Sequence, residues 1–159
     1  MTALPSLTAD RITTAVSRLF MERGAACIRE FTVRTGRRVD LMVLEDKRDI
    51  TIVEVKSSRQ DFTSDTKWPE YIEWADRFYF AVAEDFPREM LPGPDRCGII
   101  ITDGFDCHVV QEAPTIKLAS ARRTHLVTRM AQKAMRRLER VAQAAGDIPL
   151  TRTGPDSTG

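Results

Sequence analysis

The spacing of apolar residues predicts an amphipathic helix near the start of the chain. In residues 8–23 the apolar side chains at helical spacing are Ile12, Val16, Leu19 and Phe20. Thr8 is suited to cap the N-terminus of this helix, and Gly24 is suited to follow its last turn. The pattern predicts one helix over residues 8–23.

Short segments rich in β-branched residues come next and predict strands. The first three lie at residues 27–33, 37–44 and 49–56. The turn signals between them, Thr35-Gly36 and residues 45–48, are short enough to make hairpins. By the same criterion, later strands are predicted at residues 77–83, 98–102 and 107–111.

Two more helical segments are predicted. Ser58 stands three residues before Asp61, which is typical of a helix start. That helical stretch runs to about Trp74, and Pro69 either interrupts or restarts it. Residues 119–144 predict a long terminal helix, with an apolar stripe made of Leu126, Met130, Met135, Leu138 and Val141.

The order of these elements is helix, three strands, helix, strand, two strands and helix. It predicts an α/β or α+β fold in which helices flank a mixed central sheet. A length of 159 residues at 42% hydrophobic suits one domain, expected over residues 1–145. Residues 146–159 are rich in Pro, Gly and Thr and are expected to form a disordered tail.

Composition indicates the cellular compartment in which the protein is expected. Charged residues make up 30% of the chain, and no apolar run is long enough to span a bilayer. The first ten residues lack the basic and then apolar pattern of a secretory signal. The three cysteines include no C-x-x-C pair, which argues against a disulfide framework or a four-ligand zinc site. We expect a cytoplasmic protein.

Charge is segregated along the chain although the net charge is only +1. Residues 117–140 contain eight basic residues and one acid, Glu139, so this segment carries about +7 and the remainder about −6. Five basic residues of the terminal helix are candidates for phosphate contacts: Arg129, Lys133, Arg136, Arg137 and Arg140. A solvated helix face is the alternative.

The strand 50–56 carries the candidate chemistry. It is apolar on both faces until Glu54 and Lys56, which share one face roughly 7 Å apart. An antiparallel hairpin with the five-residue loop 45–49 places Asp40 opposite Glu54. Two carboxylates in that position repel each other unless a proton or a cation lies between them. A divalent metal resolves the repulsion, whereas a plain Glu54–Lys56 ion pair is the alternative.

A third acid depends on the register of the preceding hairpin. With the three-residue loop 34–36, Glu30 lies opposite Asp40. With a two-residue loop, Glu30 faces the other side of the sheet. Carboxylates at strand ends suit Mg²⁺ or Mn²⁺, which keep several water ligands that a phosphate can displace. Lys56 is then placed to orient a nucleophile or to stabilise charge on a phosphodiester in its transition state.

The helical stretch after this strand also carries polar and aromatic residues. Lys67 and Tyr71 are four residues apart and predict a joint phosphate contact, whereas Trp68 and Trp74 are more typical of a core or its edge.

The motif residues resemble a known superfamily. Asp40, thirteen intervening residues and Glu54-Val55-Lys56, in this element order, resemble the PD-(D/E)XK nucleases, and more closely the bacterial MmcB-type DNA repair proteins. The resemblance covers residues 8–140 and is closest in residues 37–62 and 65–82. It implies a restriction-endonuclease-like αβββαβ core, to which this chain adds the basic C-terminal helix.

The resemblance also implies roles for these residues. Asp40 and Glu54 would be metal ligands, the carbonyl of Val55 a third oxygen ligand, and Lys56 the catalytic lysine. The first helix lacks the acid that many members carry, since residues 12–14 are Ile-Thr-Thr. Glu30 is the better candidate for the missing acid.

These observations predict a Mg²⁺- or Mn²⁺-dependent protein that cleaves DNA in DNA repair. A DNA-binding repair factor without turnover is the alternative, and a partner-binding module that uses residues 68–80 is a third. The expected partner is DNA, with no membrane and no small-molecule cofactor. A homodimer is left open.

Overall fold

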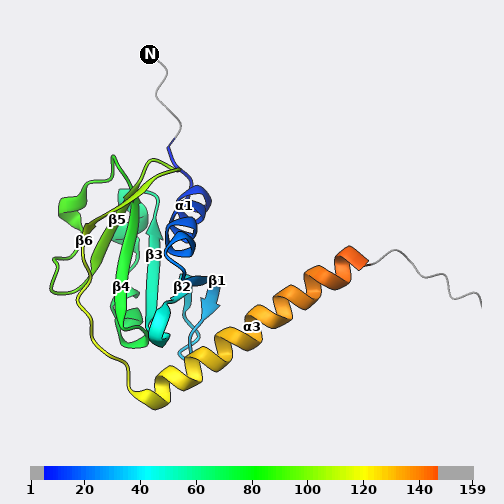
Figure 1. The fold of residues 1–159 in the computed structure, drawn as a ribbon. Helices are drawn as coiled ribbons and strands as arrows, with labels where there is room; N and C mark the ends of the chain where they lie inside the picture. Colours follow the sequence, from blue (N-terminus) through cyan, green and yellow to red (C-terminus); the bar gives the residue numbers. More distant parts are fainter. Residues whose placement is uncertain (1–5, 147–159) are drawn as a thin grey trace, which may run out of the picture.

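The computed structural model describes residues 6–146. Its helices are α1 (Ala9–Glu22), α2 (Arg59–Ser64) and α3 (Ser120–Gly146). Its strands are β1 (Ala26–Thr32), β2 (Arg38–Leu44), β3 (Ile50–Lys56), β4 (Arg77–Ala83), β5 (Gly98–Thr102) and β6 (Cys107–Gln111). Three short 3₁₀ helices are η1 (Asp46–Arg48), η2 (Trp68–Trp74) and η3 (Arg88–Met90). The predicted α/β fold and its αβββαβ order are confirmed (Figure 1).

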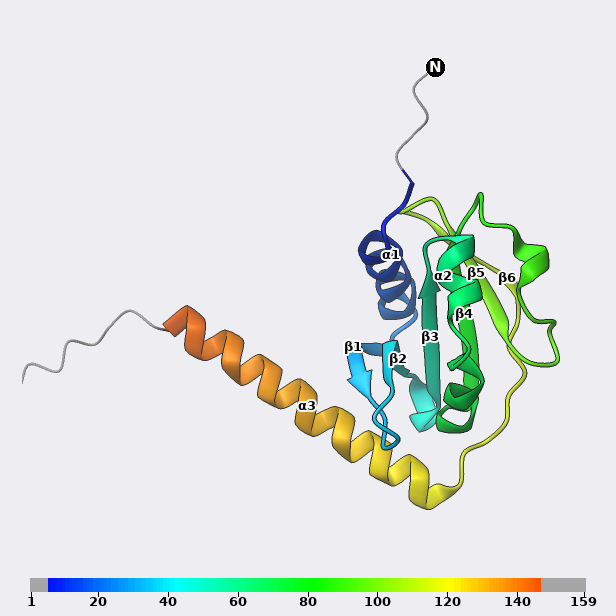
Figure 2. The ribbon, with the colours of Figure 1, turned by 180° about the vertical axis from the view of Figure 1, so that it is seen from behind.

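The six strands form one mixed sheet in the order β1-β2-β3-β4-β5-β6. Neighbouring strands are antiparallel except for the β3–β4 and β4–β5 pairs, which are parallel. One face of the sheet is covered by α1, which packs with Leu41 and Val53. The other face carries α2 and η2, which lie in front of β3 and β4 in Figure 2. The central strands β3 and β4 are therefore buried on both faces, which explains their near-continuous apolar sequence.

Local signals set the ends of the helices. The hydroxyl of Thr8 accepts a hydrogen bond from the Arg11 N–H at 3.3 Å and caps α1. Ser58 caps α2 in the same way through the Asp61 N–H at 3.1 Å. The helical stretch expected to reach Trp74 is in fact two helices, because α2 ends at Ser64 and the chain restarts as η2 next to Pro69.

The two N-terminal hairpins adopt the predicted registers. The Val33 N–H donates to the Arg37 carbonyl at 2.8 Å, which closes the three-residue loop 34–36. Gly36 in this loop has φ 83°, a left-handed conformation that favours glycine. In the next hairpin, Met42 pairs with Ile52 across the loop 45–49. The three-residue alternative for the first hairpin is therefore correct.

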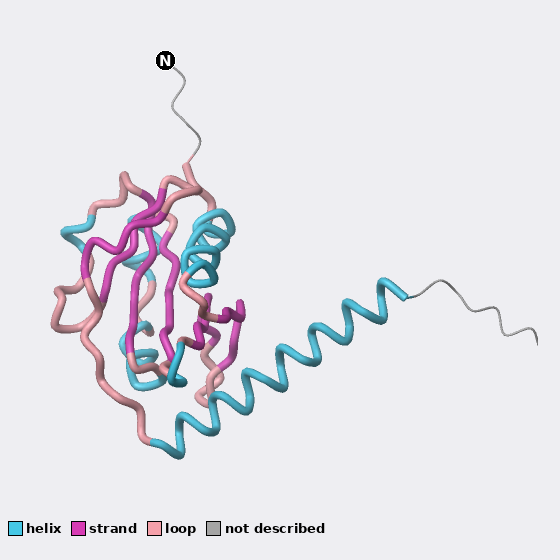
Figure 3. The backbone as a smooth tube through the Cα atoms, in the orientation of Figure 1, coloured by secondary structure: helices cyan, strands magenta, loops and turns pink. Residues whose placement is uncertain are grey.

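The long helix predicted from this apolar stripe is present as α3, but only the first half of the stripe is buried. Leu126 and Met130 are buried against the sheet. Met135, Leu138 and Val141 are 69%, 70% and 65% exposed. The reason is that α3 continues beyond the edge of the sheet at β1, as the longest cyan helix in Figure 3 shows. An amphipathic pattern identifies the apolar face of a helix, but it does not identify what covers that face.

The start of α3 is fixed to the body of the molecule by Asp76. Its carboxylate accepts two hydrogen bonds from the Arg123 guanidinium, both at 2.6 Å. It also accepts the backbone N–H groups of Ile50 and Leu118, at 2.7 and 2.8 Å. Segment 147–159, expected to be disordered, lies outside the described residues. Within residues 6–146, no helix has both the length and the hydropathy needed to cross a bilayer.

Candidate functional site

Strands β2 and β3 separate where the motif acids lie. Their backbone pairing ends at Leu41 and Val53. Beyond that point the Asp40 N–H donates to Oε1 of Glu54 at 2.9 Å, and the Val55 N–H donates to Oδ2 of Asp40 at 2.8 Å. Each carboxylate thus bonds the backbone of the opposite strand. This exchange replaces the backbone ladder and holds the two acids next to each other.

Burial makes both carboxyl groups harder to ionise than they are in water. Burial raises the pKa of Glu54 to about 8, and the nearby charge of Asp40 adds to the increase. Burial also raises the pKa of Asp40 above its usual range, against the opposing effects of the Val55 N–H and Lys56. A cation or a proton between these groups is therefore favourable at neutral pH.

Lys56 is buried at the end of β3, but it does not pair with Glu54. Its Nζ donates to Oδ2 of Asp65 at 2.7 Å. Burial raises the pKa of Asp65, but hydrogen bonds from Lys56 and from the Lys67 N–H together bring it below its usual range. The alternative of a Glu54–Lys56 ion pair is therefore wrong, because Lys56 pairs with Asp65 instead. Sequence reasoning missed this partner because it comes from the segment after α2.

Glu30 falls opposite Asp40 in the β1–β2 register, but the two residues are not paired. The β1–β2 pairing passes from Arg29 and Leu41 to Phe31 and Val39 without it. Glu30 has φ 52°, which takes it out of the strand conformation, and it is exposed. The register that suggested Glu30 is therefore correct, but among residues 6–146 Glu30 does not form a three-acid metal group with Asp40 and Glu54.

The acids fit a metal that uses few protein ligands. Among residues 6–146, no three His, Cys, Asp or Glu side chains are grouped as metal ligands. In this described part, the second oxygens of Asp40 and Glu54 accept no hydrogen bond. Mg²⁺ commonly binds through one or two carboxylates and retains water molecules. The buried carboxylate of Glu54 and the half-buried carboxylate of Asp40, each with an uncommitted oxygen, meet that requirement.

The residues after α2 divide into exposed and structural positions. Lys67 is exposed. Tyr71 is buried and its hydroxyl donates to the Arg38 carbonyl at 3.4 Å, so Tyr71 is not exposed for the predicted phosphate contact, which stays a prediction for Lys67. Trp74 is buried, and Trp68 stacks on Phe78 with ring centroids 6.0 Å apart. Both tryptophans therefore belong to the core or its edge.

A second feature is a basic groove where α3 crosses β1, with a volume of about 270 Å³. It is lined by Phe31, Arg129, Gln132, Lys133, Arg136, Arg137 and Arg140. Lys133 and Arg137 donate to the Glu30 carbonyl at 3.0 and 3.2 Å. Arg137 also donates to the Arg29 carbonyl at 2.5 Å, so these two side chains fasten α3 to β1. In the described chain, Arg136 and Arg140 have no such partner.

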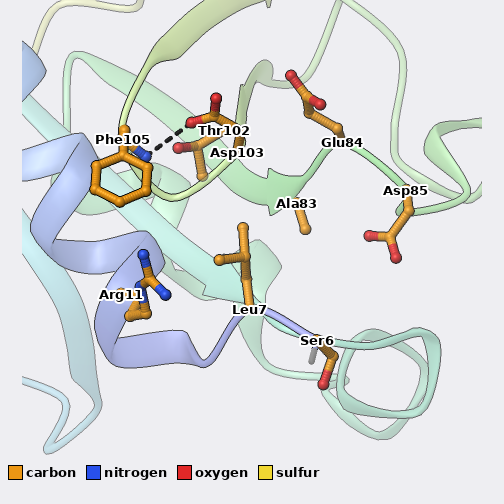
Figure 4. A pocket seen from close by; sticks show the side chains of 9 residues that line it. All are labelled: Ser6, Leu7, Arg11, Ala83, Glu84, Asp85, Thr102, Asp103 and Phe105. Carbon is orange, nitrogen blue, oxygen red and sulfur yellow. Dashed lines mark hydrogen bonds between the residues drawn. The ribbon is translucent and has the colours of Figure 1, made fainter. Parts of the chain in front are cut away.

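A separate hollow of about 460 Å³ lies at the carboxyl ends of β4 and β5 (Figure 4). Its walls include the acids Glu84, Asp85 and Asp103, with Arg11 from α1. None of the motif residues Asp40, Glu54 and Lys56 lines it. It does not form part of the candidate metal site.

The structure defines an α/β protein in which an aspartate on β2 lies beside a glutamate and a lysine near the end of the central strand β3. The chain belongs to the MmcB-like family of DNA repair proteins, whose sequence profile matches residues 3–145. No curated protein matches it in sequence.

Two solved structures are similar to this chain. One is the SPO1766 protein of unknown function from Silicibacter pomeroyi, at 39% identity and a TM-score of 0.79. That similarity covers 92% of this chain and 97% of the other. The second is a repair endonuclease from Pyrococcus abyssi, at 15% identity and a TM-score of 0.34, covering 65% of this chain and 42% of the other.

Proposed function

We propose that this protein binds Mg²⁺ or Mn²⁺ through Asp40 and Glu54 and hydrolyses phosphodiester bonds of DNA during repair. The observation that carries the proposal is the exchange of hydrogen bonds between the two acids where β2 and β3 separate. It keeps two carboxylates together at a cost in repulsion that a divalent cation removes. Membership of a DNA repair family supports DNA as the substrate.

The side chains have separate roles in this proposal. Asp40 and Glu54 would hold the metal through their uncommitted oxygens, with the Val55 carbonyl as a further candidate ligand. The bound metal would supply charge stabilisation and an activated water. Lys56 would stabilise negative charge on the phosphate, in a position that Asp65 fixes. Arg136 and Arg140 would contact the DNA backbone.

A second candidate function is DNA binding without turnover. The observation that favours it is that Lys56 already donates to Asp65, so its charge is partly neutralised. In addition, α1 offers no acid at residues 12–14, and Glu30 lies outside the β1–β2 pairing. In this case the fold would supply a basic surface and the motif would be structural.

A cleavage assay with isosteric variants tests the first function against the second. Single-stranded, duplex and branched DNA are incubated with Mn²⁺ and the wild type, Asp40→Asn or Lys56→Met. Cleavage by the wild type should fall by about 10²-fold or more in each variant. Asp46→Asn removes an exposed acid in η1, at the other end of β3, and should cleave normally. DNA binding by a wild type that never cleaves would support the second function.

A thermal-shift titration tests the metal site without any activity. Mn²⁺ should stabilise the wild type by about 2.7 kcal/mol at a hundredfold excess over Kd. Asp40→Asn keeps an oxygen for the Val55 N–H but removes one charge, so the metal-free variant should melt at or above the wild-type temperature. Its response to Mn²⁺ should shrink sharply. Equal responses in both proteins would place the ion elsewhere.

A further inference from the structure

Helix α3 carries an apolar seam along most of its length. The seam consists of Val127, Ala131, Ala134, Leu138, Val141 and Ala145. These residues are alternately four and three positions apart, the spacing that keeps side chains on the contact line of two packed helices. The seam contains no charged residue.

The two halves of the seam lie in different surroundings. The first half borders an apolar groove of about 220 Å³ between α3 and the β1–β2 hairpin. This apolar groove is lined by Ala26, Cys27, Ile28, Leu44, Val127, Met130, Ala131 and Ala134. The second half projects beyond β1, where Leu138 and Val141 are largely exposed (Figures 1 and 3). Thus one half has an unfilled apolar groove, and the other has uncovered apolar side chains.

The charges of α3 lie away from the seam. Taking 100° per residue, Arg129, Arg136 and Arg140 lie on the opposite side of the helix from Leu138. They line the basic groove, which is on the other flank of α3 from the apolar groove. A second molecule with the same strongly basic helix can therefore approach the seam without direct contact between like charges.

We infer that the seam binds α3 of a second copy of this chain in an antiparallel arrangement. A twofold axis near residue 136 places Leu138 opposite Ala134, Val141 opposite Ala131, and Ala145 opposite Val127. Each contact then joins a large side chain to a small one. The projecting half of each helix fills the apolar groove of the other molecule, so one symmetric contact satisfies both halves of the seam. The overlap of residues 127–145 is about 28 Å long.

Two features of α3 favour a second copy over a lipid surface. A helix lying on lipid needs its whole apolar face at the outer surface. Ala131 and Ala134 instead line a groove beside β1, and their small side chains leave room for another helix rather than projecting. The exposed side chains of the projecting half, Leu138 and Val141, are then covered by this groove of the other molecule.

The first test is the mass of the full-length chain in solution, measured by sedimentation equilibrium or light scattering. At about 100 μM the wild type should have twice its 18.0 kDa monomer mass. Leu138→Glu/Val141→Glu should be monomeric, with the dimer weakened at least about 100-fold. Its melting curve at low concentration should match that of the wild type, because both side chains are exposed in the single chain. Arg136→Gln/Arg140→Gln, on the opposite face, should remain dimeric.

The second test fixes the register by disulfide cross-linking. Ala134→Cys in a tagged chain is mixed with Leu138→Cys in an untagged chain, both with Cys27→Ser to remove the native thiol from the groove. The mixed pair should cross-link faster than either protein alone, and Arg136→Cys should not cross-link. A wild type that stays monomeric at 100 μM would overturn the inference. Binding of such a monomer to anionic vesicles would show that the seam contacts lipid instead. Equal loss of dimer in both double variants would also overturn it.

Discussion

The ammonium group of Lys56 lies 2.7 Å from Oδ2 of Asp65, so the lysine at the end of β3 is tied to the segment that follows α2. Both side chains are mostly shielded from water. A charge pair in such a place contributes little net stability, but loss of one partner leaves the other charge buried and uncompensated. The position of Lys56 beside the acids thus depends on Asp65.

Asp65→Asn should therefore destabilise the protein by about 3 kcal/mol, because the charge of Lys56 then has no partner. Lys56→Met/Asp65→Asn should cost less than the sum of the two single changes, since it removes both charges together. Urea denaturation of the four proteins gives the coupling free energy. A loss below about 0.5 kcal/mol for Asp65→Asn would show that the pair is solvent-screened and that Asp65 does not hold Lys56.

The proximity of Asp40 and Glu54 could be predicted from the sequence because it depends on local rules. Side chains alternate along a strand, and the two loop lengths set the register. The pairing of Lys56 with Asp65 could not be predicted, since the path after α2 depends on how η2 packs. The conformation of Glu30 also has no local signal, because no glycine marks it. Its carbonyl is bound by Lys133 and Arg137, more than a hundred residues away along the chain.

The two halves of α3 also differ in how well the sequence describes their surroundings. The helical periodicity correctly predicts a long helix, in whose first half Leu126 and Met130 are buried. It also places Leu138 and Val141 on the apolar stripe, but it does not show that the sheet ends before them and leaves them exposed. Where a sheet ends relative to a helix is a property of the whole fold.

The raised pKa of Glu54 predicts a pH-dependent stability. Between its ordinary value of 4.5 and the folded value of about 8, the folded protein keeps a proton that the unfolded chain has released. The free energy of unfolding should therefore fall as pH rises through this window, by up to about 1.4 kcal/mol per pH unit. Urea denaturation from pH 5 to pH 9 with a chelator present measures this slope.

Glu54→Gln is the matched variant for this measurement. The glutamine oxygen can still accept the Asp40 N–H, but the group no longer titrates. The variant should show a shallower slope and should exceed the wild type in stability at pH 8 and above. Parallel curves for the two proteins would mean that Glu54 titrates normally.

The Asp76–Arg123 pair predicts the opposite response, at acid pH. Burial opposes ionisation of Asp76, but the Arg123 guanidinium and two backbone N–H groups lower its pKa from 3.8 to about 2. The stability from this shift, about 2 kcal/mol, is fully present above pH 4 and is lost as pH falls towards 2. Asp76→Asn should be less stable than the wild type at pH 7, and the difference should narrow between pH 4 and pH 2.

Lys117→Gln serves as the control for the Asp76 experiment. Lys117 pairs with Asp49 at 2.6 Å, but its side chain is exposed, so the loss should be within about 1 kcal/mol. If Asp76→Asn and Lys117→Gln cost the same at pH 7, Asp76 would not be the anchor of α3.

The basic groove predicts how DNA binding depends on salt. Lys133 and Arg137 hold β1 carbonyls, so Arg136 and Arg140 are the variants that remove charge without loosening α3. Arg136→Gln/Arg140→Gln should weaken duplex binding equally for all sequences and reduce the slope of log K against log salt by about 0.9 for each lost phosphate contact. Fluorescence anisotropy between 50 and 200 mM salt measures that slope.

Lys47→Gln/Arg48→Gln is the control for this measurement. It removes the same charge from the exposed turn η1, at the other end of β3, and should retain the wild-type slope. An unchanged slope in the α3 variant, or an equal change in both, would mean that the DNA backbone does not lie in the basic groove.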